Sequence, residues 1–282
     1  MYNKKEPLFS DFPSVSTQEW MDKITADLKG ADFTKKLVWK TNEGFPVQPF
    51  YRAEDIENLA TTGVLPGEFP YVRGTKPDNN WFVRQDIPID GDVKKANAKA
   101  LDAIEGGATS LGFCLQKEQI NSDLIAVLLN GIQANSIELN FRTCIDASAS
   151  LVSLLVCYFK TQGYADKMDK LQGSIDFDPI TRILLKGRDY DKDAIAVKAK
   201  ATVEAAAGLS GYRIVGVGAA VLNNAGAYIT QELGYALAWG VEYLNLLIDA
   251  DVDAAEAAQR IRFNFGVGGN YFLEIAKFRA AR

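Results

Sequence analysis

Two aspartates end a β-rich run in the sequence GSIDFDP. Asp176 and Asp178 stand two residues apart, so both carboxylates can lie on one face of a strand and face a ligand or a metal ion. Pro179 suits the first turn of a helix, which makes an N-cap the simpler role for Asp178. If this run is a strand of a β/α barrel, the simpler role for Asp176 is that of a polar residue inside the barrel or at its mouth. With Lys186, the two carboxylates could also serve an autonomous lyase or isomerase.

Histidine is absent from all 282 residues. The commonest general base and the commonest metal ligand are therefore missing, and two acids without imidazole predict no metal site. The three cysteines, Cys114, Cys144 and Cys157, match neither a disulfide framework nor a zinc motif. We expect them to be reduced, buried small residues.

Three further stretches carry polar groups at the ends of β-rich runs. Arg142 could hold an acidic group of a ligand or could pair with Asp146, and the sequence favours neither reading. GVGG (266–269) could bind phosphate through backbone N–H groups, although a tight turn explains these glycines more simply. AAVLNN (219–224) has no side chain that moves a proton at neutral pH, and Asn223 remains a possible ligand contact.

Composition excludes several classes of function. The chain carries 31 basic and 36 acidic residues, a net charge of −5, and it has no basic cluster that would follow a nucleic-acid backbone. No apolar run approaches the roughly 20 residues that cross a bilayer. The N-terminus MYNKKEPLFSDF lacks the apolar core of a signal peptide. We therefore expect a cytoplasmic protein without nucleic-acid or membrane partners.

From about residue 80, short β-rich runs alternate with amphipathic helical segments. This pattern predicts a parallel sheet covered by helices, as in a (β/α)8 barrel of the TIM type. Only six units are present, so we expect residues 81–282 to be the front part of a longer barrel, and residues 1–80 an extended arm for subunit association. The six β-rich runs are 81–87, 108–115, 136–143, 173–179, 212–218 and 262–268.

Several stretches resemble one family, the methylmalonyl-CoA mutases. KLVWKTNEGFPVQPFYRAEDI (36–56) is similar to a segment near the start of these enzymes, and FPYVRG (69–74) followed by VRQDI (83–87) is similar to their "P-[YF]-x-R-G" and "I-R-Q" elements. NNAGAYITQELGYALAWGVEYL (223–244) resembles their "Q-E-A-G-A" helix. NYFLEIAKFRAAR (270–282) closely resembles "F-F-x-E-[IV]-A-K-x-R-A-A-R".

The resemblance implies a barrel whose axis takes the coenzyme A chain of the substrate, and adenosylcobalamin on a C-terminal domain that we expect this chain to lack. In catalytic members a Tyr-His pair precedes the "Q-E-A-G-A" helix, and Ala220 and Val221 occupy those positions here. The arginine that holds the substrate carboxylate falls near Lys186 or Arg188.

The chain therefore resembles the smaller, non-catalytic subunit of heterodimeric members. The resemblance implies a large catalytic partner that carries adenosylcobalamin and interconverts (R)-methylmalonyl-CoA and succinyl-CoA, whereas this chain binds no cofactor. Besides the autonomous lyase or isomerase, an acyl-CoA-binding regulatory barrel remains open as an alternative.

Overall fold

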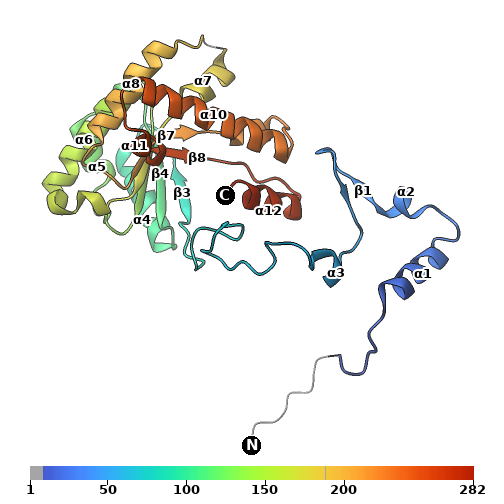
Figure 1. The fold of residues 1–282 in the computed structure, drawn as a ribbon. Coiled ribbons are helices and arrows are strands. Elements are labelled where there is room, and N and C mark those ends of the chain that lie inside the picture. The colour runs from blue at the N-terminus through green and yellow to red at the C-terminus, as the bar shows by residue number, and fades with distance from the viewer. Residues whose placement is uncertain (1–8, 188) are drawn as a thin grey trace, which may run out of the picture. The chain divides into compact units, whose positions relative to one another are not determined.

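The computed structural model describes residues 9–187 and 189–282, which form two compact units that divide between Gly63 and Val64 (Figure 1). Residues 64–80 thus group with the segment that follows them. Among the described residues, no helix combines the length and the apolarity that a bilayer crossing requires.

The first unit consists of short elements with few buried side chains. It contains helices α1 (Thr17–Asp27), α2 (Phe33–Leu37) and α3 (Ala53–Ile56) and a hairpin of β1 (Trp39–Lys40) and β2 (Pro46–Val47). Ser16 caps α1: its hydroxyl accepts a hydrogen bond from the Glu19 N–H, and the Glu19 carboxylate accepts one from the Ser16 N–H. This reciprocal capping starts α1. None of the residues in the three helices of the first unit is buried.

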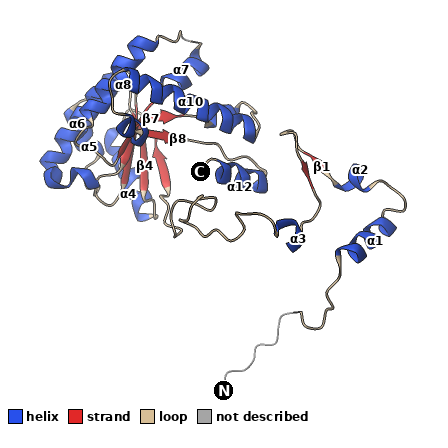
Figure 2. Cartoon of the chain, viewed as in Figure 1, coloured by secondary structure: helices blue, strands red, loops and turns tan. Residues whose placement is uncertain are grey.

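The second unit is built on a six-stranded parallel sheet (Figure 2). Its strands pair in chain order, each with its sequence neighbours. This order confirms the predicted β/α architecture, and each of the six predicted β-rich runs overlaps a strand. The strands are β3 (Arg84–Ile87), β4 (Ser110–Cys114), β5 (Glu138–Arg142), β6 (Gly173–Phe177), β7 (Tyr212–Val217) and β8 (Ile261–Phe263).

Helices separate the strands along the chain, and Figure 1 shows α4, α5, α6 and α8 along one side of the sheet. Aspartate or asparagine side chains accept hydrogen bonds from the first turns of several of these helices, as at Asp92, Asn121 and Asp191, which is why they begin where they do. The α-helices are α4 (Val93–Glu105), α5 (Ser122–Leu128), α6 (Ser148–Phe159), α7 (Pro179–Lys186), α8 (Lys192–Ala205), α9 (Ala220–Asn224), α10 (Ile229–Asp249), α11 (Ala254–Gln259) and α12 (Tyr271–Ala280). Three tighter or wider helical segments are η1 (Lys117–Gln119), η2 (Lys160–Tyr164) and η3 (Ala165–Lys170).

The two faces of the sheet differ in character. Leu111, Phe113, Leu139 and Phe141 belong to the hydrophobic core, whereas the residues that alternate with them along β4 and β5 include the buried polar residues Ser110 and Asn140. Because side chains on a strand alternate between its faces, one face packs against the helices and the other presents a polar surface. The polar face is the inner face of the β/α arc.

Residues 220–224 form a short helix, α9. The expectation that the three cysteines are buried was wrong. Cys114 and Cys157 are exposed and Cys144 is half-buried, because each lies on a surface position of its strand, loop or helix rather than in the core.

Candidate functional site

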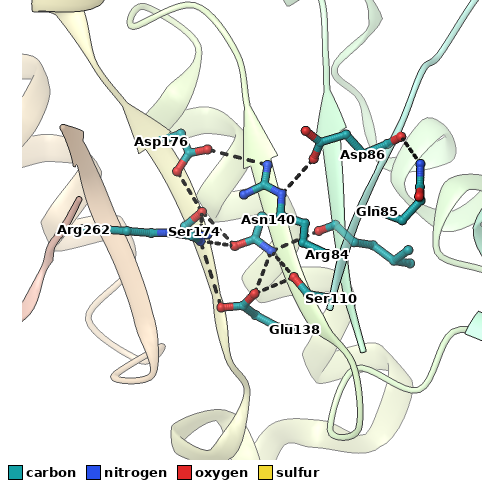
Figure 3. A network of polar contacts seen from close by, with 10 residues as sticks. Arg84, Gln85, Asp86, Ser110, Glu138, Asn140, Ser174, Asp176 and Arg262 are labelled. Atoms are coloured by element: carbon teal, nitrogen blue, oxygen red, sulfur yellow. Dashed lines mark hydrogen bonds and ion pairs between the residues drawn. The ribbon is translucent and has the colours of Figure 1, made fainter. Parts of the chain in front are cut away.

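A network of polar side chains covers the middle of the inner face (Figure 3). The Asn140 amide donates to Ser110 Oγ at 2.9 Å and to Glu138 Oε2 at 3.1 Å, and Ser174 Oγ donates to Asn140 Oδ1 at 2.9 Å. Asn140 and Ser174 are almost completely buried. These three strands, β4, β5 and β6, therefore have their inward polar groups paired with one another.

Arg262 completes this network from β8. Its Nη1 donates to Asn140 Oδ1 and to Ser174 Oγ, the latter at 3.0 Å, and lies 4.0 Å from Glu138 Oε1. To make these contacts the side chain passes over β7, which lies between β8 and β6 in the sheet. The guanidinium therefore lies across the inner face of the sheet.

Asp176 occupies an irregular position where β6 ends. Its φ of +47° is in the left-handed region, and the β6–β7 register shifts between Ser174 and Phe177. Asp176 Oδ1 accepts from Ser174 Oγ at 2.8 Å, and Oδ2 lies 3.9 Å from Arg84 Nη2. Asp176 thus lies at the mouth of the arc, where the sequence placed it, with an arginine beside it.

Asp178 is the N-cap of α7, as the following proline predicted. Its carboxylate accepts hydrogen bonds from the Thr181 N–H at 3.1 Å, Thr181 Oγ1 at 2.6 Å, the Gly218 N–H at 3.0 Å and the Tyr243 hydroxyl at 2.7 Å. Burial raises the pKa of Asp178, and these hydrogen bonds, which favour the ionised form, only partly offset it. With four donors already bound, the carboxylate has little capacity left for a substrate.

A cavity of about 680 Å³ opens at the carboxyl ends of the strands. In β/α proteins this end of the sheet carries the ligand site. Four arginines and three aspartates line the cavity, and Ala220 and Val221 form part of its wall. The charged residues are Arg84, Asp86, Arg142, Asp176, Asp178, Arg182 and Arg262.

Arg142 lies at this mouth and not in a pair with Asp146. Asp146 instead pairs with Lys198 Nζ at 2.6 Å, so the proposed Arg142–Asp146 pair does not form. The pKa of the Arg142 guanidinium is raised: burial acts to lower it, but the Cys114 side chain and the carboxylates of Asp176 and Asp86 outweigh that effect.

Two other predicted ligand contacts lie elsewhere. Lys186 is exposed at the end of α7 and does not line the cavity, because it follows Arg182 by four residues and the helix carries it away from the mouth. The Asn223 amide donates to Glu232 Oε2 at 3.2 Å, which holds it against α10. Arg188, the second candidate for the carboxylate-binding arginine, lies outside the described residues.

Two backbone N–H groups of the GVGG segment donate to carboxylates of the protein itself. The Gly266 N–H donates to Glu232 Oε1 at 2.6 Å and the Gly268 N–H to Glu274 Oε1 at 2.9 Å. Lys277 Nζ lies 2.6 Å from both carboxylates. This buried ionic cluster takes two of the backbone donors that a phosphate would need, and the sequence offers no sign of it beyond the i, i+3 spacing of Glu274 and Lys277.

A family model described as methylmalonyl-CoA mutase matches residues 40–118 and 119–282. The chain belongs to the methylmalonyl-CoA mutase family. A methylmalonyl-CoA mutase small subunit from Porphyromonas gingivalis is 53% identical over 285 residues, which covers 100% of this chain and 45% of the relative. A small subunit from Streptomyces virginiae is 30% identical and covers 98% of this chain and 45% of its own length. A large subunit from the same organism is 26% identical over 96% of this chain and 40% of the relative.

The chain thus spans less than half the length of these mutase relatives. The 282 residues include no histidine that could bind the cobalt of adenosylcobalamin.

Proposed function

We propose that this chain is part of the small subunit of a heterodimeric methylmalonyl-CoA mutase. It supports a large catalytic subunit that carries adenosylcobalamin and interconverts (R)-methylmalonyl-CoA and succinyl-CoA in the cytoplasm. The chain itself is catalytically inactive and binds no cofactor. The similarity of nearly the whole of this chain to parts of two proteins named as small subunits supports this assignment.

Arg262 is the observation that carries the proposal of inactivity. Its guanidinium is bound to Asn140 and Ser174 across the inner face, where the resemblance requires open space for the coenzyme A chain. The cavity wall adds Ala220 and Val221, which cannot move protons, at the positions of the Tyr-His pair. A site whose inner arginine is already bound by the protein and which has no acid-base pair is suited to support rather than to radical chemistry.

The geometry gives the autonomous lyase or isomerase little support. Asp178 is held by four hydrogen-bond donors, and Lys186 is exposed outside the cavity. Proton transfer needs the base within hydrogen-bond reach of its substrate. Asp176, Asp178 and Lys186 do not converge on one point where a substrate could lie. The regulatory acyl-CoA barrel meets the same obstacle at Arg262.

The first unit provides the segment that we assign to subunit association. It exposes large apolar side chains, among them Phe12 at 72%, Trp20 at 48%, Trp39 at 46% and Tyr51 at 58%. Aromatic residues are enriched at the centres of protein interfaces. We assign this surface to contact with the large subunit.

A visible-absorption titration with adenosylcobalamin tests the assignment of the cofactor. The isolated chain should give no saturable change, whereas the large subunit should give one under the same conditions. A saturable change with micromolar affinity for the isolated chain would contradict the proposal.

Co-purification with the large subunit tests the assignment of the arm. Trp39→Ala should weaken retention of the large subunit by at least about tenfold, the usual effect of an interface anchor, while Lys40→Ala on the same hairpin should change it little. The thermal transition of the β/α unit should be the same in both variants. Equal retention of the two variants, or unfolding of the β/α unit by Trp39→Ala, would assign the arm to another role.

A further inference from the structure

Helix α12 buries its charged side chains and exposes its aromatic ones. Of its 10 residues, all of which the structure describes, only Glu274 and Lys277 are buried. Tyr271 and Phe272 are 72% and 80% exposed. Charged residues are seldom buried unless they are paired, whereas large apolar residues usually are buried. The buried contacts that attach α12 to the rest of the second unit are therefore ionic.

Apolar contacts add little to this attachment. Phe278 is half-buried and contacts Phe265, with the ring centroids 6.0 Å apart. Between α12 and residues 72–74 lies a cavity of about 470 Å³. Well-packed protein interiors leave few voids larger than a water molecule, so α12 is not packed tightly on that side. Its position depends mainly on its two buried charged residues.

Lys277 lies at the centre of the ionic contacts. Its Nζ donates to Glu232 Oε2 of α10 at 2.6 Å and to the Gly266 carbonyl at 2.8 Å, and it lies 2.6 Å from Glu274 Oε2. Three acceptors thus surround its three N–H donors. The Lys277 and Glu232 side chains are completely buried, and a buried charge that loses its partner is strongly destabilising.

The two carboxylates extend the attachment to neighbouring segments. Glu232 accepts hydrogen bonds from the Gly266 N–H at 2.6 Å and from the Asn223 amide of α9 at 3.2 Å. Glu274 accepts one from the Gly268 N–H at 2.9 Å. Helices α9, α10 and α12 and the loop before α12 therefore meet at one cluster. We call Glu232, Glu274 and Lys277 the ionic lock.

The segments held by the ionic lock form part of the mouth cavity. Ala220, Val221 and Asn264 line this cavity, and the Ala220 N–H donates to the Asn264 carbonyl at 2.9 Å. Residues 264–270 thus connect the cavity wall to α12. Moving α12 away would take Lys277 from Glu232 and release this part of the wall.

We propose that residues 264–280 form a strap at the wall of the mouth cavity, which the ionic lock holds closed and which opens as a unit while the sheet stays folded. An attachment of this kind fails as a whole, because loss of one partner leaves the other charges buried without compensation. Segments with few buried apolar contacts open at a lower free energy than the core of a domain. The strap is independent of the proposed subunit role.

Native-state hydrogen exchange in low urea tests the strap in the wild-type small subunit that contains this chain. Amides of residues 264–280 should exchange through one common opening that occurs at least about tenfold more often than the opening of residues 138–142. Exchange of the strap amides only by global unfolding, together with the sheet, would overturn the proposal.

Lys277→Met tests the ionic lock, because it leaves the carboxylates of Glu232 and Glu274 buried without their cation. The strap amides should exchange at least about tenfold faster than in the wild type, whereas residues 138–142 should remain protected by at least about a hundredfold relative to an unstructured chain. Lys192→Met is the matched control, since it breaks an ion pair of 2.9 Å between exposed side chains, Lys192 and Asp249.

The control should leave the exchange of the strap amides within about twofold of the wild type, because exposed ion pairs contribute little to stability. Equal acceleration in the two variants would overturn the proposal. So would strap amides that keep their wild-type protection in Lys277→Met, or a loss of protection throughout the sheet of that variant.

Discussion

Arg262 and Arg142 both lie on the inner face of the sheet, but the protein treats their guanidinium groups differently. Arg262 is bound by Asn140 and Ser174 and lies near Glu138. Arg142 lies near Cys114, Asp176 and Asp86, which raise the pKa of its guanidinium, and among the described residues it forms no ion pair within 4.0 Å. The middle of the inner face is therefore internally paired, while the mouth keeps unused donors.

This contrast separates residues that stabilise the fold from residues that can bind a ligand. Removing one member of a paired buried network leaves its partners without compensation, so such residues should affect stability strongly. Removing a side chain whose donors are unused leaves no buried partner unpaired in the folded protein. Such residues should therefore affect ligand binding and not stability. The substitutions below test this separation.

The largest effect should follow Arg262→Leu. The variant leaves the carboxylate of Glu138 and the buried amide of Asn140 without their cation, which should lower the free energy of unfolding by about 3 kcal/mol. Arg182→Leu, at the mouth, should change it by less than about 0.5 kcal/mol. Urea unfolding at pH 7 measures both, and equal losses would end the distinction between the two regions.

A smaller loss is expected for Asp178→Ala. The substitution removes the cap of α7 and leaves the Gly218 N–H and the Tyr243 hydroxyl without their acceptor, which should cost about 2 kcal/mol of unfolding free energy. Asp253→Ala removes the exposed cap of α11 and should cost about 1 kcal/mol. Thermal or urea unfolding compares the two variants. If Asp253→Ala loses more unfolding free energy than Asp178→Ala, the additional hydrogen bonds of Asp178 do not stabilise the fold.

Hydrogen exchange should distinguish the strands themselves. Strand β5 pairs with strands on both sides, whereas β8 pairs only with β7 among the described residues. Amides of residues 261–263 should therefore exchange at least about tenfold faster than those of residues 138–142, because opening an edge strand breaks fewer contacts. Comparable protection of the two strands would mean that another segment covers β8.

The smallest effect concerns the pH dependence of stability at Asp178. Its pKa in the folded state is raised above the unfolded value, so its stability contribution is fully present below the unfolded pKa and is lost as the pH rises through the folded pKa. The unfolding free energy of the wild type, measured relative to Asp178→Asn, should increase as the pH falls from 7 to about 4. A decrease over this range would mean that the hydrogen bonds to Asp178 outweigh its burial.

The local features of this fold could be predicted from the sequence, since they depend on neighbouring residues. The β-rich runs, the helix after Ser16 and the cap formed by Asp178 before Pro179 are of this kind. Arg262 contacts Asn140 across 122 residues, and Lys277 reaches Glu232 across 45. Such contacts depend on strand register and helix packing, which no local pattern specifies, so the position of Arg262 and the carboxylates bound to the GVGG segment could not be predicted.

The same limit explains the mixed result for the candidate ligand contacts. Arg142 and Asp176 lie at strand ends, and the parallel sheet brings such ends to one edge. Lys186 and Asn223 lie on helices, where a single turn decides whether a side chain faces the cavity. Their positions depend on how α7 and α9 pack, which the sequence pattern leaves open.

The formation of succinyl-CoA from (R)-methylmalonyl-CoA, with adenosylcobalamin present, tests the central claim most directly. The rate should be measured for the small subunit that contains this chain, for the large subunit, and for the large subunit titrated with the small one. We predict no turnover by the small subunit alone and a saturable increase in the activity or stability of the large subunit as the small subunit is added. Turnover by the small subunit alone, or a large subunit whose activity and stability are indifferent to it, would contradict the account.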